Sequence, residues 1–112
     1  MSYVRPTVHT ALVASGGTTS QALQVAQGTI AGLITPGTLT STAITFTACD
    51  TVDGTFVAVY DSDGNQVSVA VAASRACGLS GEEADALAPW PYIKVVCGSA
   101  EGADRSIKVI VR

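Results

Sequence analysis

The stretch ITFTACDTVDGTFVAVYDSDGNQVSVAV, residues 44–71, decides the fold class. In its first part, ITFTAC, apolar residues alternate with Thr and Cys, which is the pattern of a half-buried β-strand. Asp53-Gly54 is a hairpin-turn signal, and DSDGN (61–65) turns the chain again before the alternating run VSVAV (67–71). The stretch therefore predicts three antiparallel strands, near 44–49, 56–60 and 67–71, arranged as a meander.

Short apolar runs between turn residues continue on both sides of this stretch. Further strands are expected at 22–25, 29–35, 74–79, 92–97 and 106–112. The sequence SGEE (80–83) is a capping box, which predicts one or two helical turns through Leu87, ended by Pro89. Short strands with a turn signal about every 8 to 12 residues are typical of sandwiches. The sequence predicts an all-β, single-domain antiparallel β-sandwich of the jelly-roll type with one short helical turn.

The length of 112 residues is that of one domain. We assign residues 1–10 to an N-terminal arm or edge segment and residues 11–112 to the sandwich domain. The first ten residues have no apolar core of signal-peptide length, and no run approaches the ~20 apolar residues of a membrane span. The protein is therefore expected to mature in the cytosol where it is made.

The chain carries few charges. Six basic and nine acidic residues give a net charge of −3 and make up 13% of the chain, about half the usual share. This balance offers no electrostatic footprint for nucleic acid and little attraction to anionic membranes, so neither is an expected partner. Two explanations of the low charge stay open: part of the surface is covered by copies or by another protein, or the surface is neutral and rich in Thr and Ser.

The three cysteines, Cys49, Cys77 and Cys97, are widely spaced and have no neighbouring His that would suggest a zinc site. They are expected to be buried free thiols that a reducing compartment keeps apart. A Cys49–Cys97 disulfide stays open as an alternative if the strands that carry the two residues are neighbours.

Residues that catalysis or metal binding would need are scattered. Asp61, Asp63 and Asn65 suit a hairpin turn, since the glycine and the final carboxylate of a calcium loop are not at the required places. His9 has no nucleophile or carboxylate near it in the sequence, and an enzyme would need His9 and a distant carboxylate to meet in a pocket. We expect no enzymatic activity, no metal and no cofactor.

Trp90 is the candidate binding residue, because the prolines on both sides fix its approach. Loop aromatics anchor protein contacts or stack on sugars, and in a carbohydrate-binding module Trp90 and Tyr92 would form the stacking surface. In the alternative interpretation, Trp90 caps the open end of the sandwich. As a protein contact, Trp90 is expected to lie at one end of the molecule together with the loop of residues 36–41. The expected partner-contact residues are Trp90, Tyr92, Pro36 and Leu39.

A series of short motifs runs through nearly the whole chain. In order, they are SGGTTS (15–20), ITF (44–46), DGTF (53–56), YDSDG (60–64), SRA (74–76), YIK (92–94) and ADRSI (103–107). In this order the chain resembles small proteins encoded among tailed-phage head genes, a group of capsid decoration, cement and head-spike base proteins. The strand order with its DGTF turn is also similar to galactose-binding-like (discoidin-type) jelly rolls, although the sugar and calcium residues of such modules have no clear counterparts here.

The resemblance implies a non-enzymatic structural protein of a phage virion. Such a protein would sit on the outside of the head, stabilise contacts between major capsid proteins or mount a head fibre protein, and form a homo-oligomer, a trimer or a pentamer. Its place would be the capsid surface of the virion, after assembly in the host cytoplasm. Two alternatives stay open: a carbohydrate-binding module, and a structural protein of the phage neck or tail.

Overall fold

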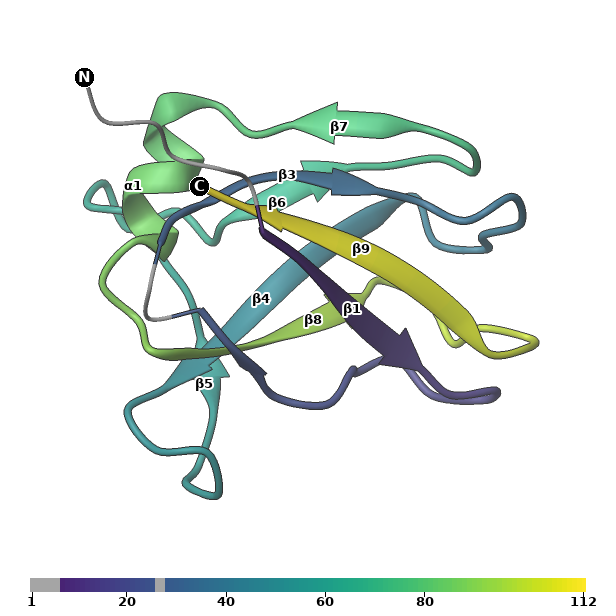
Figure 1. The fold of residues 1–112 in the computed structure, drawn as a ribbon, viewed down its shortest axis with the longest axis horizontal. Helices are drawn as coiled ribbons and strands as arrows, with labels where there is room; N and C mark the ends of the chain where they lie inside the picture. Colours follow the sequence, from purple (N-terminus) through teal and green to yellow (C-terminus); the bar gives the residue numbers. More distant parts are fainter. Residues whose placement is uncertain (1–6, 26–27) are drawn as a thin grey trace.

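A computed structural model describes residues 7–25 and 28–112, which form two antiparallel sheets packed face to face and one short helix (Figure 1). The strands are β1 (Thr7–Val13), β2 (Leu23–Gln24), β3 (Ile30–Ile34), β4 (Ala43–Cys49), β5 (Val57–Ala58), β6 (Ser68–Ala70), β7 (Ala76–Gly78), β8 (Tyr92–Cys97) and β9 (Arg105–Val111), and helix α1 is Gly81–Leu87. Among the described residues, no helix is long and apolar enough to cross a membrane.

The first sheet has the strand order β1-β9-β3-β7, and the second has the order β2-β8-β4-β5, with β6 also paired to β4. Strands β5 and β6 lie end to end along β4, because β5 pairs with Thr47 and Ala48 whereas β6 pairs with residues 43–45. When β5 and β6 are counted as one strand and the resulting eight strands are renumbered along the chain, the two sheets have the orders 1-8-3-6 and 2-7-4-5. These are the strand orders of an eight-stranded jelly roll. The predicted all-β antiparallel sandwich with one short helical turn is confirmed.

The predicted meander is wrong in its main pairing, since the third strand pairs with the first along β4 and meets the second only beside the turn, at the Tyr60–Gln66 bridge. The turn between β5 and β6 explains the difference. The Asp61 carboxylate accepts hydrogen bonds from the N–H groups of Asp63 and Asn65, both at 2.9 Å. The Val67 N–H then donates to the Val59 carbonyl at 3.0 Å. The turn therefore leaves the sheet as a narrow hairpin and returns the chain to the same side of β4.

The core lies between the sheets and is built from one face of each long strand. Phe46 is fully buried at the middle of β4, and β8 and β9 alternate as their sequences predict. Strand β3 departs from strict alternation, because a register shift between Ile30 and Gly32 turns both Ile30 and Leu33 inward and leaves Ile34 exposed. This bulge explains why the sequence of β3 looks apolar on both faces.

Strand β1 forms one edge of the first sheet and is paired with β9 from Thr7 to Val13, so it runs across the boundary drawn at residue 10. Residues 1–6 of the assigned arm lie outside the described residues. The free side of β1 is covered by a side chain: Gln21 Oε1 accepts from the Leu12 N–H at 2.9 Å, and Gln21 Nε2 donates to the Thr10 carbonyl at 2.8 Å. Gln21 thus protects the edge against pairing with another strand.

The three cysteines are free thiols, as predicted, but only Cys97 is buried, whereas Cys49 and Cys77 are partly exposed. Strands β4 and β8 are indeed neighbours, but Cys49 lies opposite Tyr92 and Cys97 lies opposite Ile44, at the two ends of the paired segment. The alternative of a Cys49–Cys97 disulfide is therefore wrong.

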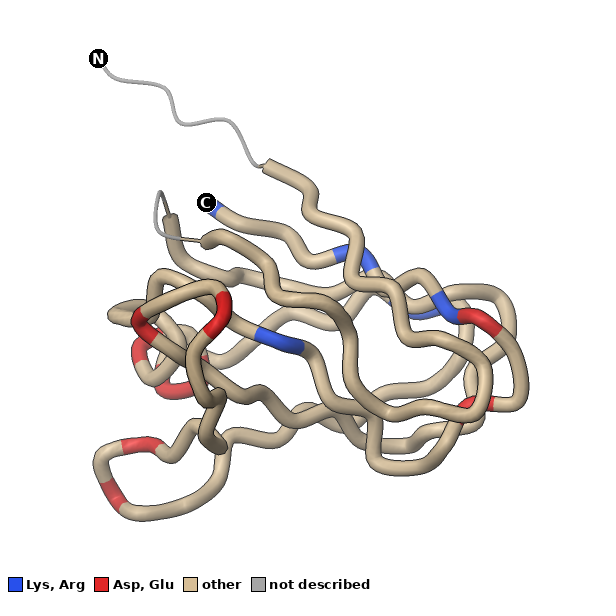
Figure 2. The backbone as a smooth tube through the Cα atoms, turned by 90° about the horizontal axis from the view of Figure 1, so that it is seen from below, with Lys and Arg blue, Asp and Glu red and all other residues tan. Residues whose placement is uncertain are grey.

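Acidic residues are kept off the strands (Figure 2). All nine acidic residues lie in turns or in α1, and the strands carry the basic residues Lys94, Arg105 and Lys108. Since Arg105 is bound to a buried carboxylate, few free charges are left on the two sheets. The low charge of the sequence therefore appears as two nearly uncharged outer faces.

Candidate functional site

A pocket of about 390 Å³ opens at the end of the sandwich where β4 ends and β8 begins. Three large apolar side chains of its wall are exposed: Trp90 by 39%, Tyr60 by 55% and Val57 by 64%. The other lining residues are Ala48, Cys49, Asp50, Thr55, Ala58 and Val59. Because exposed apolar groups that gather in a hollow mark interaction sites, this pocket is the candidate functional site.

The ring of Trp90 is held in place. Its Nε1–H donates a hydrogen bond of 2.8 Å to the carbonyl of Ala86 in the last turn of α1, and prolines flank it on both sides. The capping box that starts this helix is present as predicted, with Ser80 and Glu83 bonded to each other's backbone N–H. A fixed aromatic ring loses little conformational entropy when a partner binds, which favours Trp90 as an anchor residue.

The other expected contact residues do not join Trp90. Tyr92 points to the outer face of the second sheet, in register with Cys49 and Gln24. Pro36 and Leu39 precede β4, whereas the pocket lies at the other end of this seven-residue strand, roughly 20 Å away. Leu39 is also partly buried against the core. The prediction of one contact surface that joins Trp90 and the 36–41 loop is therefore wrong.

Tyr60 and Val57 line the pocket although neither was among the contact residues expected from the sequence. Tyr60 is the aromatic one of the two. It ends the alternating run that follows the DGTF turn, so its place at the end of a strand was visible in the sequence. The sequence did not show that Tyr60 lies next to Trp90, because the two residues are brought together by the pairing of β5 with β4 and of β4 with β8.

A second cluster lies where the hairpin between β5 and β6 meets α1. Carboxylate oxygens of Asp61, Asp63 and Glu82 lie within 4.8 Å of one another. The negative charge of Asp61, followed by that of Asp63, raises the pKa of Glu82. These residues could hold a hard cation such as calcium, but exposed acidic groups alone do not define a cation site, and the expected absence of a metal stays a prediction.

We expect Glu82→Gln to raise the melting temperature at neutral pH. The folded-state pKa of Glu82 is raised, so its ionised form destabilises the folded protein above the unfolded-state pKa of 4.5, and this effect disappears as the pH falls below that value. Thermal melts at pH 7 should show the gain at low salt and a smaller gain at high salt. Glu83→Gln is the matched control, since it removes a charge from the same helical turn and keeps the capping box. An equal gain in both variants would contradict the role of the cluster.

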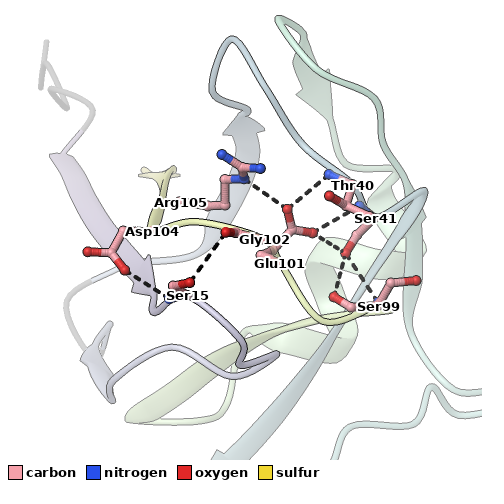
Figure 3. A network of polar contacts seen from close by, with 8 residues as sticks. All are labelled: Ser15, Thr40, Ser41, Ser99, Glu101, Gly102, Asp104 and Arg105. Carbon is pink, nitrogen blue, oxygen red and sulfur yellow. Dashed lines mark hydrogen bonds and ion pairs between the residues drawn. The ribbon is translucent and has the colours of Figure 1, made fainter.

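The end of the sandwich opposite the pocket is held by a buried carboxylate, Glu101, which is 1% exposed (Figure 3). One of its oxygens accepts from the Thr40 N–H and from Arg105 Nε, both at 2.9 Å. The other accepts from the Ser41 N–H at 2.9 Å and from the Ser41 hydroxyl at 2.6 Å. Burial alone would raise the pKa of Glu101, but these hydrogen bonds outweigh it and lower the pKa to about 2. Glu101 therefore fixes the loop before β4 to the loop before β9.

Taken together, the strand order and the pocket define a small jelly-roll domain with an aromatic wall at one end. Among solved structures, the crystal structure of the SPBc2 prophage-derived protein YomS shares this fold. The alignment covers 99% of this chain and 97% of that chain, with a TM-score of 0.55 and 18% sequence identity. At this identity the similarity shows the fold alone. No family model matches the chain, and no curated protein matches it either.

Proposed function

We propose that this chain is a non-enzymatic structural protein of a phage particle, bound to the outside of the head as a decoration or cement protein. The observation that carries the proposal is the pocket in which Trp90, Tyr60 and Val57 are exposed together. A fold shared with a prophage-derived protein supports the phage origin, and the resemblance of the motifs to head-gene proteins supports the place on the head.

The proposed partner is the major capsid protein, and a head fibre protein is a further partner that such a position would suit. An apolar side chain of the capsid protein would fill the pocket against the fixed ring of Trp90, in the manner of an interface hot spot. Specific contacts of this kind bury roughly 1,000 Å² or more, and many weak contacts on one shell add up to a stable coat. The nearly uncharged sheet faces fit a protein that is partly covered in its assembled form.

The proposal is tested by sedimentation of the purified protein with heads of the encoding phage that lack it. We expect the protein to sediment with the heads. Trp90→Ala should raise the dissociation constant at least 30-fold, which corresponds to a loss of about 2 kcal/mol of binding free energy and is typical of a hot spot. Val52→Ala is the matched control, since Val52 is 56% exposed in the loop between β4 and β5 and is not part of the pocket wall. A folded Trp90→Ala protein that binds heads as the unchanged protein does would contradict the assignment, and binding to tails instead would favour a neck or tail protein.

The same pocket supports a carbohydrate-binding module as the second candidate function. Trp90 and Tyr60, in place of the expected pair of Trp90 and Tyr92, could stack on a sugar ring. The Asp50 carboxylate and the Thr55 hydroxyl stand in the same wall and could bond its hydroxyl groups. A glycan array decides between the two candidates, because binding that is lost in Trp90→Ala supports this one and the absence of any bound glycan supports the decoration protein.

A further inference from the structure

The outer face of the first sheet carries rows of small and apolar residues. The strand registers place Val8, Ile110, Gly32 and Gly78 in one row across β1, β9, β3 and β7, and Thr10, Lys108, Ile34 and Ala76 in the next row. Lys108 is the one charged residue of these two rows. A sheet face of this composition is typical of a surface that packs against another protein.

The two margins of this face have opposite shapes. On the β1 side, Val8 and Leu12 stand out, with exposed fractions of 54% and 46%. On the β3 and β7 side, the paired glycines Gly32 and Gly78 leave a groove of about 250 Å³, which is walled by Ile34 and Ile110. The face therefore has a ridge at one margin and a groove at the other.

Consider a second copy related to the first by a two-fold axis that lies in the face, parallel to the strands and midway between β9 and β3. Across the contact, the strands of the second copy then run in the reverse order. It places β1 over β7 of a second copy and β9 over β3 of that copy. In the first row, Val8 then meets Gly78 of the second copy, and Ile110 meets Gly32. In the second row, the apolar stem of Lys108 covers Ile34 while its ammonium group reaches the solvent. Ridge and groove thus complement each other.

We propose that two copies of this chain pair face to face through this surface, with Val8 of each copy in the Gly32–Gly78 groove of the other. This pair, and not the trimer or pentamer expected from the sequence, is the assembly that the geometry favours. Pairing through the edge of β1 is disfavoured, since Gln21 occupies the free backbone groups of Leu12 and Thr10. The inference goes beyond the proposed function and does not depend on it.

The size of the face predicts a weak pair. Four strands about 4.8 Å apart and some five residues long at about 3.4 Å each give a flat area of roughly 330 Å² per copy. Even with its uneven surface, the contact stays near or below the roughly 1,200 Å² in total at which stable interfaces begin. The dissociation constant is therefore expected between about 10 and 500 μM, a range that becomes relevant when many copies are held close together. The two Lys108 residues face each other across the axis, so the pair should tighten as salt screens their charges.

Sedimentation velocity from about 1 μM to about 1 mM tests the proposal. The unchanged protein should shift from monomer to dimer over this range. Gly78→Leu should remain a monomer, because the leucine fills the groove; a Cβ at this position meets no other atom within 4 Å, so the fold tolerates it. Gly102→Leu is the matched control outside the face, where a Cβ is equally unobstructed, and it should dimerise normally.

A compensating variant makes the test specific to the ridge and the groove. Val8→Ala combined with Gly78→Leu exchanges the large and the small side chain of the row, so this double variant should regain at least part of the dimer that Gly78→Leu loses. Matching circular dichroism spectra and melting temperatures establish that each variant is folded. A protein that stays monomeric up to 1 mM, a trimer or pentamer, or dimerisation of Gly78→Leu equal to that of the unchanged protein would each overturn the proposal.

Discussion

Replacing Glu101 by alanine is expected to lower the free energy of unfolding by about 3 kcal/mol. The substitution removes the acceptor of four hydrogen bonds and leaves the Arg105 guanidinium and the N–H groups of Thr40 and Ser41 without their partner. Buried donors that lose their acceptor stay without water and without a partner, which destabilises the folded state by their full desolvation free energy. Urea unfolding at pH 7 measures the change. Asp104→Ala is the matched control: it is exposed, it bonds one backbone N–H of Ser15, and it should cost well under half as much.

The same carboxylate predicts how stability depends on pH. The pKa of Glu101 is lowered from 4.5 in the unfolded chain to about 2 in the folded protein. The ionised carboxylate therefore adds up to about 3 kcal/mol to the free energy of unfolding. This contribution is fully present above about pH 4.5 and is lost as the pH falls toward 2. Between pH 6 and pH 2, the free energy of unfolding should fall more steeply for the unchanged protein than for Glu101→Gln. Curves that run parallel for the two proteins would contradict the ionised, hydrogen-bonded state of Glu101.

Phe46→Ala is expected to lower the free energy of unfolding by about 4 kcal/mol, since Phe46 is fully buried between the sheets and its removal leaves a large cavity. Phe56, the second phenylalanine of the chain, serves as the control. It lies half-buried under Lys94, whose Nζ is 4.4 Å from the ring centre, and Phe56→Ala should cost about 1 kcal/mol. Chemical unfolding of the two variants side by side measures the difference. Equal losses would contradict the assignment of Phe46 to the core.

Much of the fold could be predicted because its elements are local. The alternating runs at 92–97 and 44–49 give β8 and β4 almost to the residue, and the capping box at Ser80 gives the start of α1. The path of β5 and β6 along β4 could not be predicted, since it depends on which strand the chain returns to after the turn at Asp61. Pairing of this kind is non-local and leaves no periodic pattern in the sequence.

The candidate site was predicted in part, for a similar reason. Trp90 is conspicuous because of its flanking prolines, but its neighbour Tyr60 is 30 positions away in the chain and comes to it only through strand pairing. Glu101 gives still less signal. It stands in the sequence SAEGADR (99–105), which looks like a polar turn, and its burial depends on Thr40 and Ser41 some 60 residues earlier.

We propose that this chain is part of a phage head, and quantitative mass spectrometry of purified particles of the encoding phage, after heads and tails have been separated, tests this place directly. We expect the protein in many copies in the head fraction and none of it in the tail fraction. Its absence from the particles, or its presence in tails alone, would show that it is not a head protein.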